Sequence, residues 1–163
     1  GTTGIQALDL LGRKVLLSSK GKCVRDYSMK ILKFTKPHLL DRGPLGKMAR
    51  VLSMRAGEWN VLTTAIMLRA RKDRELVGSA SVDFLMYSGY MMMAFHWALQ
   101  AVKATELLTS GEGKESKEFY QAKIQTAEFF FERLLPRANA HRWGALASTR
   151  SVMQMDKEQF AFN

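Results

Sequence analysis

The sequence contains one cysteine and three prolines among its 163 residues. The lone thiol, Cys23, cannot close an internal disulfide, so a disulfide scaffold is excluded and a reducing compartment is expected. Runs of alternating apolar and polar residues are scarce, which argues against a β-rich fold. The sequence also has no Cys/His cluster with metal-ligand spacing, no P-loop and no glycine-rich dinucleotide motif. We therefore predict no metal site.

The abundant residues favour helices. Leu, Met, Ala, Lys, Arg and Glu dominate a chain that is 47% hydrophobic, a composition typical of all-α proteins. The length is enough for one domain with a substantial core. We predict an all-α fold of about five helices, with an up-and-down four-helix bundle as its body.

The central feature is an uncharged run over residues 84–102, FLMYSGYMMMAFHWALQAV. Such a run is either a membrane span or a helix buried on nearly all sides. The polar groups of Ser88, His96 and Gln100 within the run favour the buried helix. His96 is expected to be a hydrogen-bonded core residue, and no membrane span is predicted.

Apolar residues at steps of three and four predict the helices, and glycine or proline marks their ends. The predicted segments are 1–17, 20–36, 45–72, 75–109 and 118–147. Gly21 is expected to end the first helix and Pro44 to begin the third, whereas Pro136 is expected to bend the last helix or to end its regular part. Residues 110–117 form a polar loop.

The helix over 45–72 has two apolar lines, which predicts contacts on two sides. The first contains Met48, Leu52, Trp59, Leu62 and Ile66, and the second contains Val51, Met54, Val61, Ala65 and Leu68. Arg55 occupies one place in the first line. Either it pairs with a carboxylate inside the interface or, as we prefer, its stem packs while its head reaches water.

The positive charge is concentrated in the first half of the chain. Residues 1–75 contain sixteen Lys or Arg and six Asp or Glu, whereas residues 76–163 contain nine of each. Such a basic surface attracts nucleic acid, anionic lipid or phosphate-bearing molecules, or it is a solvated face. Arg69, Arg71, Lys72 and Arg74 suit a helix C-terminus and could alternatively hold a phosphate. One hypothesis is therefore a non-enzymatic basic helical module that binds an acidic protein, lipid or nucleic-acid partner.

The first residues combine a helix start with a recognisable motif. Thr3 and Gln6 have the spacing of a capping box, in which each side chain bonds to the other residue's amide. The segment GTTGIQALDLLGRKV resembles the part of acyl-CoA dehydrogenases that follows their catalytic glutamate, where the pattern is Tyr-Glu-Gly-Thr-x-x-Ile-Gln. Gly1, Thr2, Ile5 and Gln6 match this pattern in order and spacing.

This resemblance implies roles for the first four residues. Gly1 would lie beside the acyl thioester, and Thr2, Thr3 and Gly4 would contact FAD, from across a subunit interface. The glutamate would precede Gly1, so no catalytic residue is assigned in this chain. No signal peptide is recognisable and the sequence does not begin with Met, so we expect Gly1 to be a processed or truncated start.

A second resemblance covers the later helices. DFLMYSGYMMMAFHWALQA and FYQAKIQTAEFFFERLLPRANAH are similar to the helical C-terminal extension of one branch of acyl-CoA dehydrogenases. The resemblance divides the chain into the last helix of the flavin-binding domain over 1–20, a helical bundle over 21–147 and a tail over 148–163. The tail either docks on the bundle or is a mobile end.

The two resemblances together imply a flavin-dependent parent enzyme of fatty acid metabolism that converts acyl-CoA to 2,3-enoyl-CoA. This chain would supply FAD contacts and a bundle for assembly or substrate shaping, and would be inactive alone. The implied partners are the rest of the dehydrogenase chain, further copies in a homo-oligomer, the acyl-CoA substrate and an electron-transfer acceptor, with no nucleic acid. The implied location is the bacterial cytoplasm or the mitochondrial matrix.

Overall fold

The computed structural model describes residues 2–160, without the side chains of Lys157 and Phe160. No strand occurs within this range, which confirms the all-α prediction. The elements are α1 (Thr3–Leu8), which continues as a π-helix (Asp9–Ser18), α2 (Lys22–Thr35) with a 3-10 turn (Lys36–His38), α3 (Pro44–Ala70), α4 (Glu75–Ser110), α5 (Lys117–Phe129), a π turn (Phe130–Leu134), a 3-10 turn (Leu135–Arg137), α6 (Ala138–Ala145), α7 (Arg150–Met153) and a last 3-10 turn (Lys157–Phe160).

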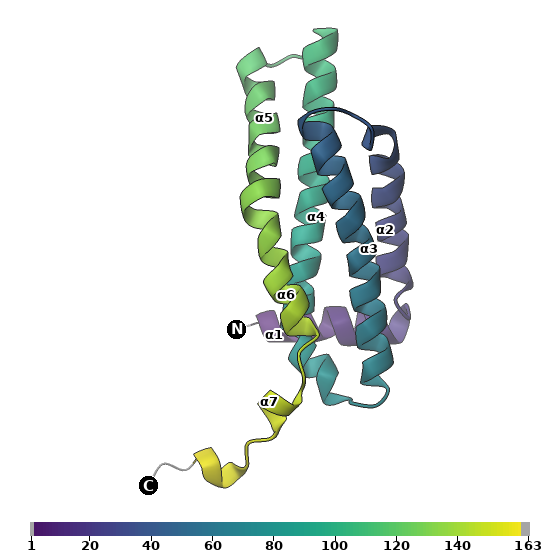
Figure 1. Cartoon of the computed structure of the whole chain (residues 1–163), viewed down its shortest axis with the longest axis vertical. Helices are drawn as coiled ribbons and strands as arrows, with labels where there is room; N and C mark the ends of the chain where they lie inside the picture. Colours follow the sequence, from purple (N-terminus) through teal and green to yellow (C-terminus); the bar gives the residue numbers. More distant parts are fainter. Residues whose placement is uncertain (1, 161–163) are drawn as a thin grey trace.

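The long helices form the predicted up-and-down bundle. Helices α2, α3 and α4 run alternately along the bundle, and α5 with α6 forms its fourth rod (Figure 1). The first helix, residues 3–18, lies across one end of the bundle instead of along it (Figure 1). Residues after α6 lead away from the bundle, although the Thr149 hydroxyl still donates to the Asp73 carboxylate.

The turns follow the predicted signals. Lys20 and Gly21 both have positive φ, 49° and 78°, and end the first helix. Pro44 is the first residue of α3, where its missing N–H costs nothing. Gly111, with φ of 72°, caps α4 and allows its amide to bond to the Leu107 carbonyl. The regular part of α5 ends before Pro136, as expected.

The first apolar line of α3 lies in the core as predicted, with all five of its members at most 5% exposed. It packs against the inner face of α4, where Phe84, Tyr87 and Met91 are fully buried. Phe95 extends the core to α2 through edge-on contacts with Tyr27 and Phe34. Each such large apolar side chain contributes about 1.5–3 kcal/mol by leaving water.

Two burial predictions are wrong. Helix α4 is not buried on nearly all sides: Met86, Met92 and Met93 are 39–51% exposed, and His96 is exposed instead of being a core residue. The reason is that the other helices of this chain leave one side of α4 uncovered. The second apolar line of α3 is largely uncovered for the same reason, with Met54 and Val61 more than half exposed. No helix between residues 2 and 160 is long and apolar enough to cross a membrane.

Candidate functional site

The predicted cofactor residues lie together at an open helix start. Thr2, Thr3 and Gly4 are all exposed, whereas Gly1 lies outside the described residues. The predicted capping box is wrong: Thr2, not Thr3, precedes the helix, no side chain caps it, and the Gln6 amide bonds to the Thr2 carbonyl at 2.9 Å. The helix begins one residue earlier than the box requires, so Thr3 already has helical geometry.

This helix start has the properties of an anion or polar-group acceptor. No side chain caps this helix, and its first turn contains no acidic residue. A Cβ added at Gly4 would meet no atom within 4 Å, so another molecule or another part of a longer chain could approach the backbone closely. Positive partial charge at a helix N-terminus favours phosphate and carboxylate groups there.

The bundle holds this helix by one side only. Ala7, Leu11 and Val15 are at most 1% exposed and pack towards α4. On the other side, Ile5 is 70% exposed. Arg13 is bonded to Asp9, and this hydrogen bond holds the pKa of Asp9 below its ordinary value.

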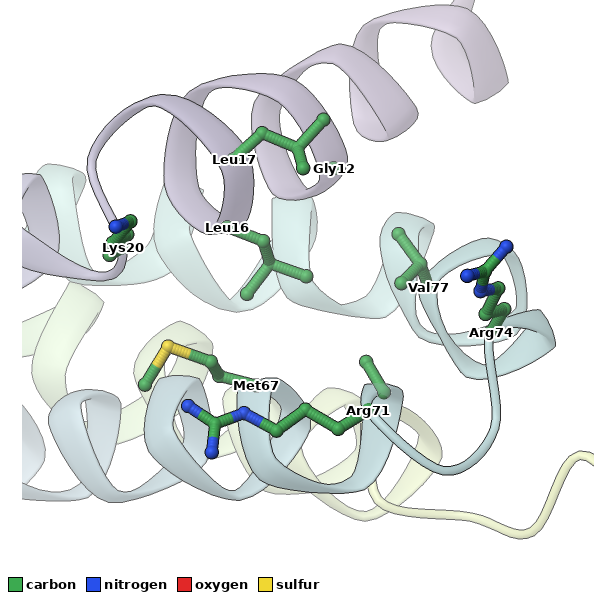
Figure 2. A pocket seen from close by; sticks show the side chains of 9 residues that line it. Gly12, Leu16, Leu17, Lys20, Met67, Arg71, Arg74 and Val77 are labelled. Carbon is green, nitrogen blue, oxygen red and sulfur yellow. The ribbon is translucent and has the colours of Figure 1, made fainter.

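A cavity of about 690 Å³ lies between the first helix, the end of α3 and the start of α4. Its surface is mainly apolar, and three cations line it: Lys20 from the end of the first helix, and Arg71 and Arg74 from the turn between α3 and α4 (Figure 2). No carboxylate within residues 2–160 lies within 4.0 Å of these cations. The apolar lining residues are Gly12, Leu16, Leu17, Met67, Ala70 and Val77.

The neighbouring Arg69 has a different role. It donates to the carbonyl oxygens of Leu146 and Ala147 at 2.7 and 3.2 Å, which ties the end of α6 to α3. The cations predicted at the end of α3 therefore have two different roles. Arg69 binds the carbonyl groups at the C-terminal end of α6, whereas Arg71 and Arg74 line the cavity and can bind an anion there.

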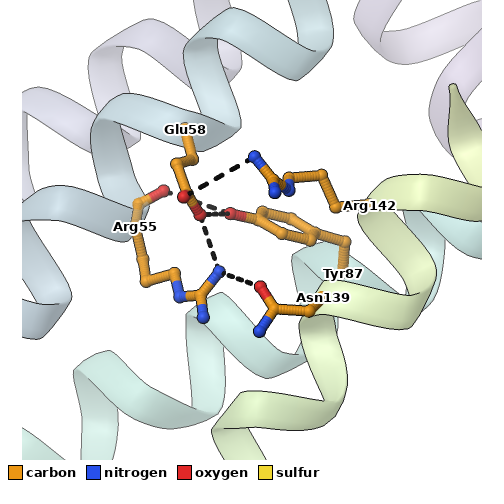
Figure 3. A network of polar contacts seen from close by, with 5 residues as sticks. All are labelled: Arg55, Glu58, Tyr87, Asn139 and Arg142. Carbon is orange, nitrogen blue, oxygen red and sulfur yellow. Dashed lines mark hydrogen bonds and ion pairs between the residues drawn. The ribbon is translucent and has the colours of Figure 1, made fainter.

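A polar network joins α3, α4 and α6 inside the bundle (Figure 3). Arg55 Nη1 donates to Glu58 Oε2 at 2.7 Å and to Asn139 Oδ1 at 2.6 Å. The Tyr87 hydroxyl donates to Glu58 at 3.3 Å, and Arg142 lies 3.7 Å from the same carboxylate. Burial, helped by the Glu58 charge, raises the pKa of Tyr87 far above its ordinary value.

Our preferred interpretation of Arg55 is therefore wrong, and the alternative of a carboxylate partner is confirmed. The Arg55 side chain is only 10% exposed because α6 covers it and supplies Asn139. The sequence could suggest Glu58, three residues away on the same helix. No sequence pattern indicated Asn139, which lies 84 residues after Arg55.

The remaining reactive residues make separate local contacts. His141 Nδ1 lies 2.8 Å from Asp83 Oδ1, and its ring stacks on Tyr90, a pairing that sequence reasoning missed. The thiol of Cys23 is exposed and accepts a hydrogen bond from Ser19. Among residues 2–160, no three His, Cys, Asp or Glu side chains gather closely enough to hold a metal ion.

The chain is similar to acyl-CoA dehydrogenases in comparisons both with protein families and with individual proteins. The family described as "Acetyl-CoA dehydrogenase C-terminal like" matches residues 28–156. The chain is 33% identical over 147 residues to 3-methylmercaptopropionyl-CoA dehydrogenase of Ruegeria pomeroyi, covering 86% of this chain and 23% of that protein. It is 29% identical over 166 residues to the broad-specificity linear acyl-CoA dehydrogenase FadE5 of Mycobacterium tuberculosis, covering 98% and 27%. The chain thus spans about a quarter of the length of these curated relatives.

Proposed function

Because this chain belongs to the acyl-CoA dehydrogenase family, as a C-terminal segment, we propose that it forms the end of an FAD-dependent enzyme that oxidises acyl-CoA to 2,3-enoyl-CoA. The family match over 28–156 carries this proposal. The one-sided packing of the first helix supports it, because the exposed Ile5 on its other side can pack against another part of the parent enzyme.

In this proposal the first helix is the last helix of the flavin-binding domain, over 1–20, followed by the bundle over 21–147 and the tail over 148–163. Thr2, Thr3 and Gly4 contact FAD through hydroxyl and amide groups, and Gly1 lies beside the acyl thioester. FAD, when bound, accepts the hydride. The glutamate that removes the α-proton precedes Gly1, so this chain binds and orients without transferring the proton itself.

The remaining proposals concern the parent enzyme as a whole. The rest of the dehydrogenase chain contacts the open side of the first helix, and the enzyme is a homo-oligomer that takes acyl-CoA and passes electrons to an electron-transfer acceptor. It works in the bacterial cytoplasm or the mitochondrial matrix, in fatty acid metabolism. The isolated 163 residues, mixed with acyl-CoA, FAD and an electron acceptor, are expected to show no turnover, and any turnover contradicts the assignment of the base.

Substitution of Gly4 in the longer parent enzyme tests the cofactor contact. Gly4→Asp adds a negative charge to the first helical turn, where the helix itself favours an acidic residue. We therefore expect folding to be preserved while the FAD content of the purified enzyme falls at least about tenfold, which corresponds to about 1.4 kcal/mol. Gly4→Ala, which adds only a methyl group in open space, is the uncharged control.

Comparison of the two variants separates the effect of the added charge on FAD binding from the effect of the added side-chain volume. Equal FAD content in Gly4→Asp and wild type would contradict a cofactor phosphate or other anionic group near this turn. Loss of FAD in Gly4→Ala as well as Gly4→Asp would instead indicate that the backbone approaches the cofactor too closely for any side chain. Circular dichroism of the same preparations checks that the helix content is unchanged.

The cavity favours a second candidate function, the binding of an anionic partner by a basic helical module. Its three cations line a mainly apolar surface and have no carboxylate partner among residues 2–160. Salt-dependent retention of the chain on anionic vesicles or on DNA would support this function. Retention that is unchanged in an Arg71→Gln, Arg74→Gln double variant would contradict a role for the cavity.

A further inference from the structure

The cavity between the first helix, α3 and α4 has the size and lining of a small-molecule site. Its volume of about 690 Å³ lies within the range of about 300–1,000 Å³ that is usual for such sites. Leu16 of the first helix and Met67 of α3 lie on opposite sides of it, and apolar side chains form most of its surface (Figure 2). The first helix is π-helical here, over Asp9–Ser18, a rare conformation that often occurs at functional sites.

The charged part of the lining is entirely positive. Lys20, Arg71 and Arg74 are the charged residues of the cavity, and all three are exposed, so a ligand can reach them. None of them forms an ion pair with a carboxylate in the described part of the chain. An anion bound in the cavity would therefore gain charge-assisted hydrogen bonds without displacing a carboxylate of this chain.

The two components of the lining together restrict the chemistry of the ligand. A small inorganic anion would contact the cations but leave the apolar walls against water, whereas an uncharged apolar molecule would leave the cations without a partner. We propose that the cavity binds a single-chain amphiphile with an anionic head group, of the type of a medium-chain fatty acid anion. The chain lies between Leu16 and Met67, and the carboxylate binds the cations of the lining. This inference deepens the second candidate function, the binding of an anionic partner, and does not depend on the dehydrogenase function.

The position of the cavity favours one small molecule over a membrane surface, and separates it from the proposed FAD contact. The first helix approaches α4 closely at Gly12, where an added Cβ would lie 3.4 Å from Val77 Cγ1. The broad surface of a bilayer does not fit into a concave site between helices, but a single chain does. Gly12 follows Thr2 by ten residues, which is roughly 15 Å along a helix.

Isothermal titration calorimetry with three probes measures both components of binding. Decanoate, added as a monomer to the 163-residue chain, should bind with a dissociation constant on the order of 100 μM. Acetate lacks the chain and should bind at least about 100-fold more weakly, because each buried methylene adds about threefold to affinity. Decanol lacks the charge and should bind at least about tenfold more weakly. A negative heat capacity change for decanoate would mark the burial of its chain.

Arg71→Gln tests the cations, with Lys72→Gln as the matched control. The two residues are neighbours and both are exposed, but only Arg71 lines the cavity. Each variant removes one positive charge from the same turn, so the general attraction of the basic surface for anions changes equally. We expect Arg71→Gln to weaken decanoate binding about 5- to 10-fold and Lys72→Gln to weaken it less than about twofold.

Leu17→Asn tests the apolar wall, with Leu68→Asn as its control. Leu17 lines the cavity and is 76% exposed, whereas Leu68 is 52% exposed and lies outside the lining. Because neither side chain belongs to the core, both variants should keep the wild-type circular dichroism spectrum. We expect only Leu17→Asn to weaken decanoate binding, by about threefold or more, and to leave acetate binding unchanged.

The outcomes distinguish this inference from the candidate function on which it rests. Acetate that binds as tightly as decanoate, with Arg71→Gln weakening both, would leave an anion site but overturn the amphiphile. Decanoate that does not bind at millimolar concentration would also overturn it. If the chain is then retained on phosphatidylglycerol vesicles or on DNA through Arg71, the second candidate function stands with a different partner. Without such retention, both proposals are wrong.

Discussion

The network around Glu58 should contribute more to stability than any surface ion pair of this chain. Its carboxylate is 25% exposed and accepts from Arg55, whose side chain is 10% exposed. Glu58→Gln keeps the shape and the acceptor for Tyr87 but removes the charge between Arg55 and Arg142. The lost charge-assisted hydrogen bond is worth about 1.5–3 kcal/mol, and the more exposed Arg142 contact less than about 1 kcal/mol. We expect a loss of about 2 kcal/mol.

Urea unfolding followed by circular dichroism measures this loss directly, and the melting temperature should fall by about 4–8 °C. The single variant Arg55→Met and the double variant complete a double-mutant cycle. Because Arg55→Met also removes the cation that Glu58→Gln leaves without a partner, the double variant should be about 1–2 kcal/mol more stable than additivity predicts. Additive losses, or a loss below about 0.5 kcal/mol for Glu58→Gln, would refute the reasoning.

Two glycines and one surface ion pair give further testable predictions. Gly144→Ala would place a Cβ against the Asp83 carboxylate, which already contacts His141, and should destabilise the chain by about 1–3 kcal/mol in urea unfolding. The matched change Gly57→Ala, in open space, should stabilise it by about 0.5–1 kcal/mol. The hydrogen bond from Lys47 lowers the pKa of Glu132 from 4.5, so this pair stabilises the fold above that pH and stops doing so as the pH falls through the lowered value. NMR titration should show that the pKa of Glu132 rises towards its ordinary value in Lys47→Met.

The sequence predicted the helices well because their signals are local. Steps of three and four apolar residues, together with Gly21, Pro44 and Pro136, define most helix ends to within a few residues. The family was also predictable from short segments, and the family match includes the basic middle of the chain, where the resemblance was weak. These successes depend on residues that are near one another in the chain.

The errors concern contacts between distant residues. Arg55 is covered by Asn139, and His141 pairs with Asp83, 58 positions earlier, and no local pattern announces either contact. The cavity likewise combines Lys20 with Arg71 and Arg74, which become neighbours only because the first helix crosses the end of the bundle. Sequence periodicity shows that a helix has an apolar side, but not which element covers it.

The uncharged run of α4 also shows that the sequence does not identify which element covers an apolar helix surface. Its sequence predicts burial on nearly all sides, and the single chain buries Phe84, Tyr87 and Met91 but leaves Met92 and Met93 exposed. Charge is absent from the exposed side as completely as from the buried side. An exposed helix surface normally contains charged residues, because they are well solvated there at little cost. The lack of charge therefore marks this side of α4 as a packing surface, but the sequence pattern does not identify the element that covers it.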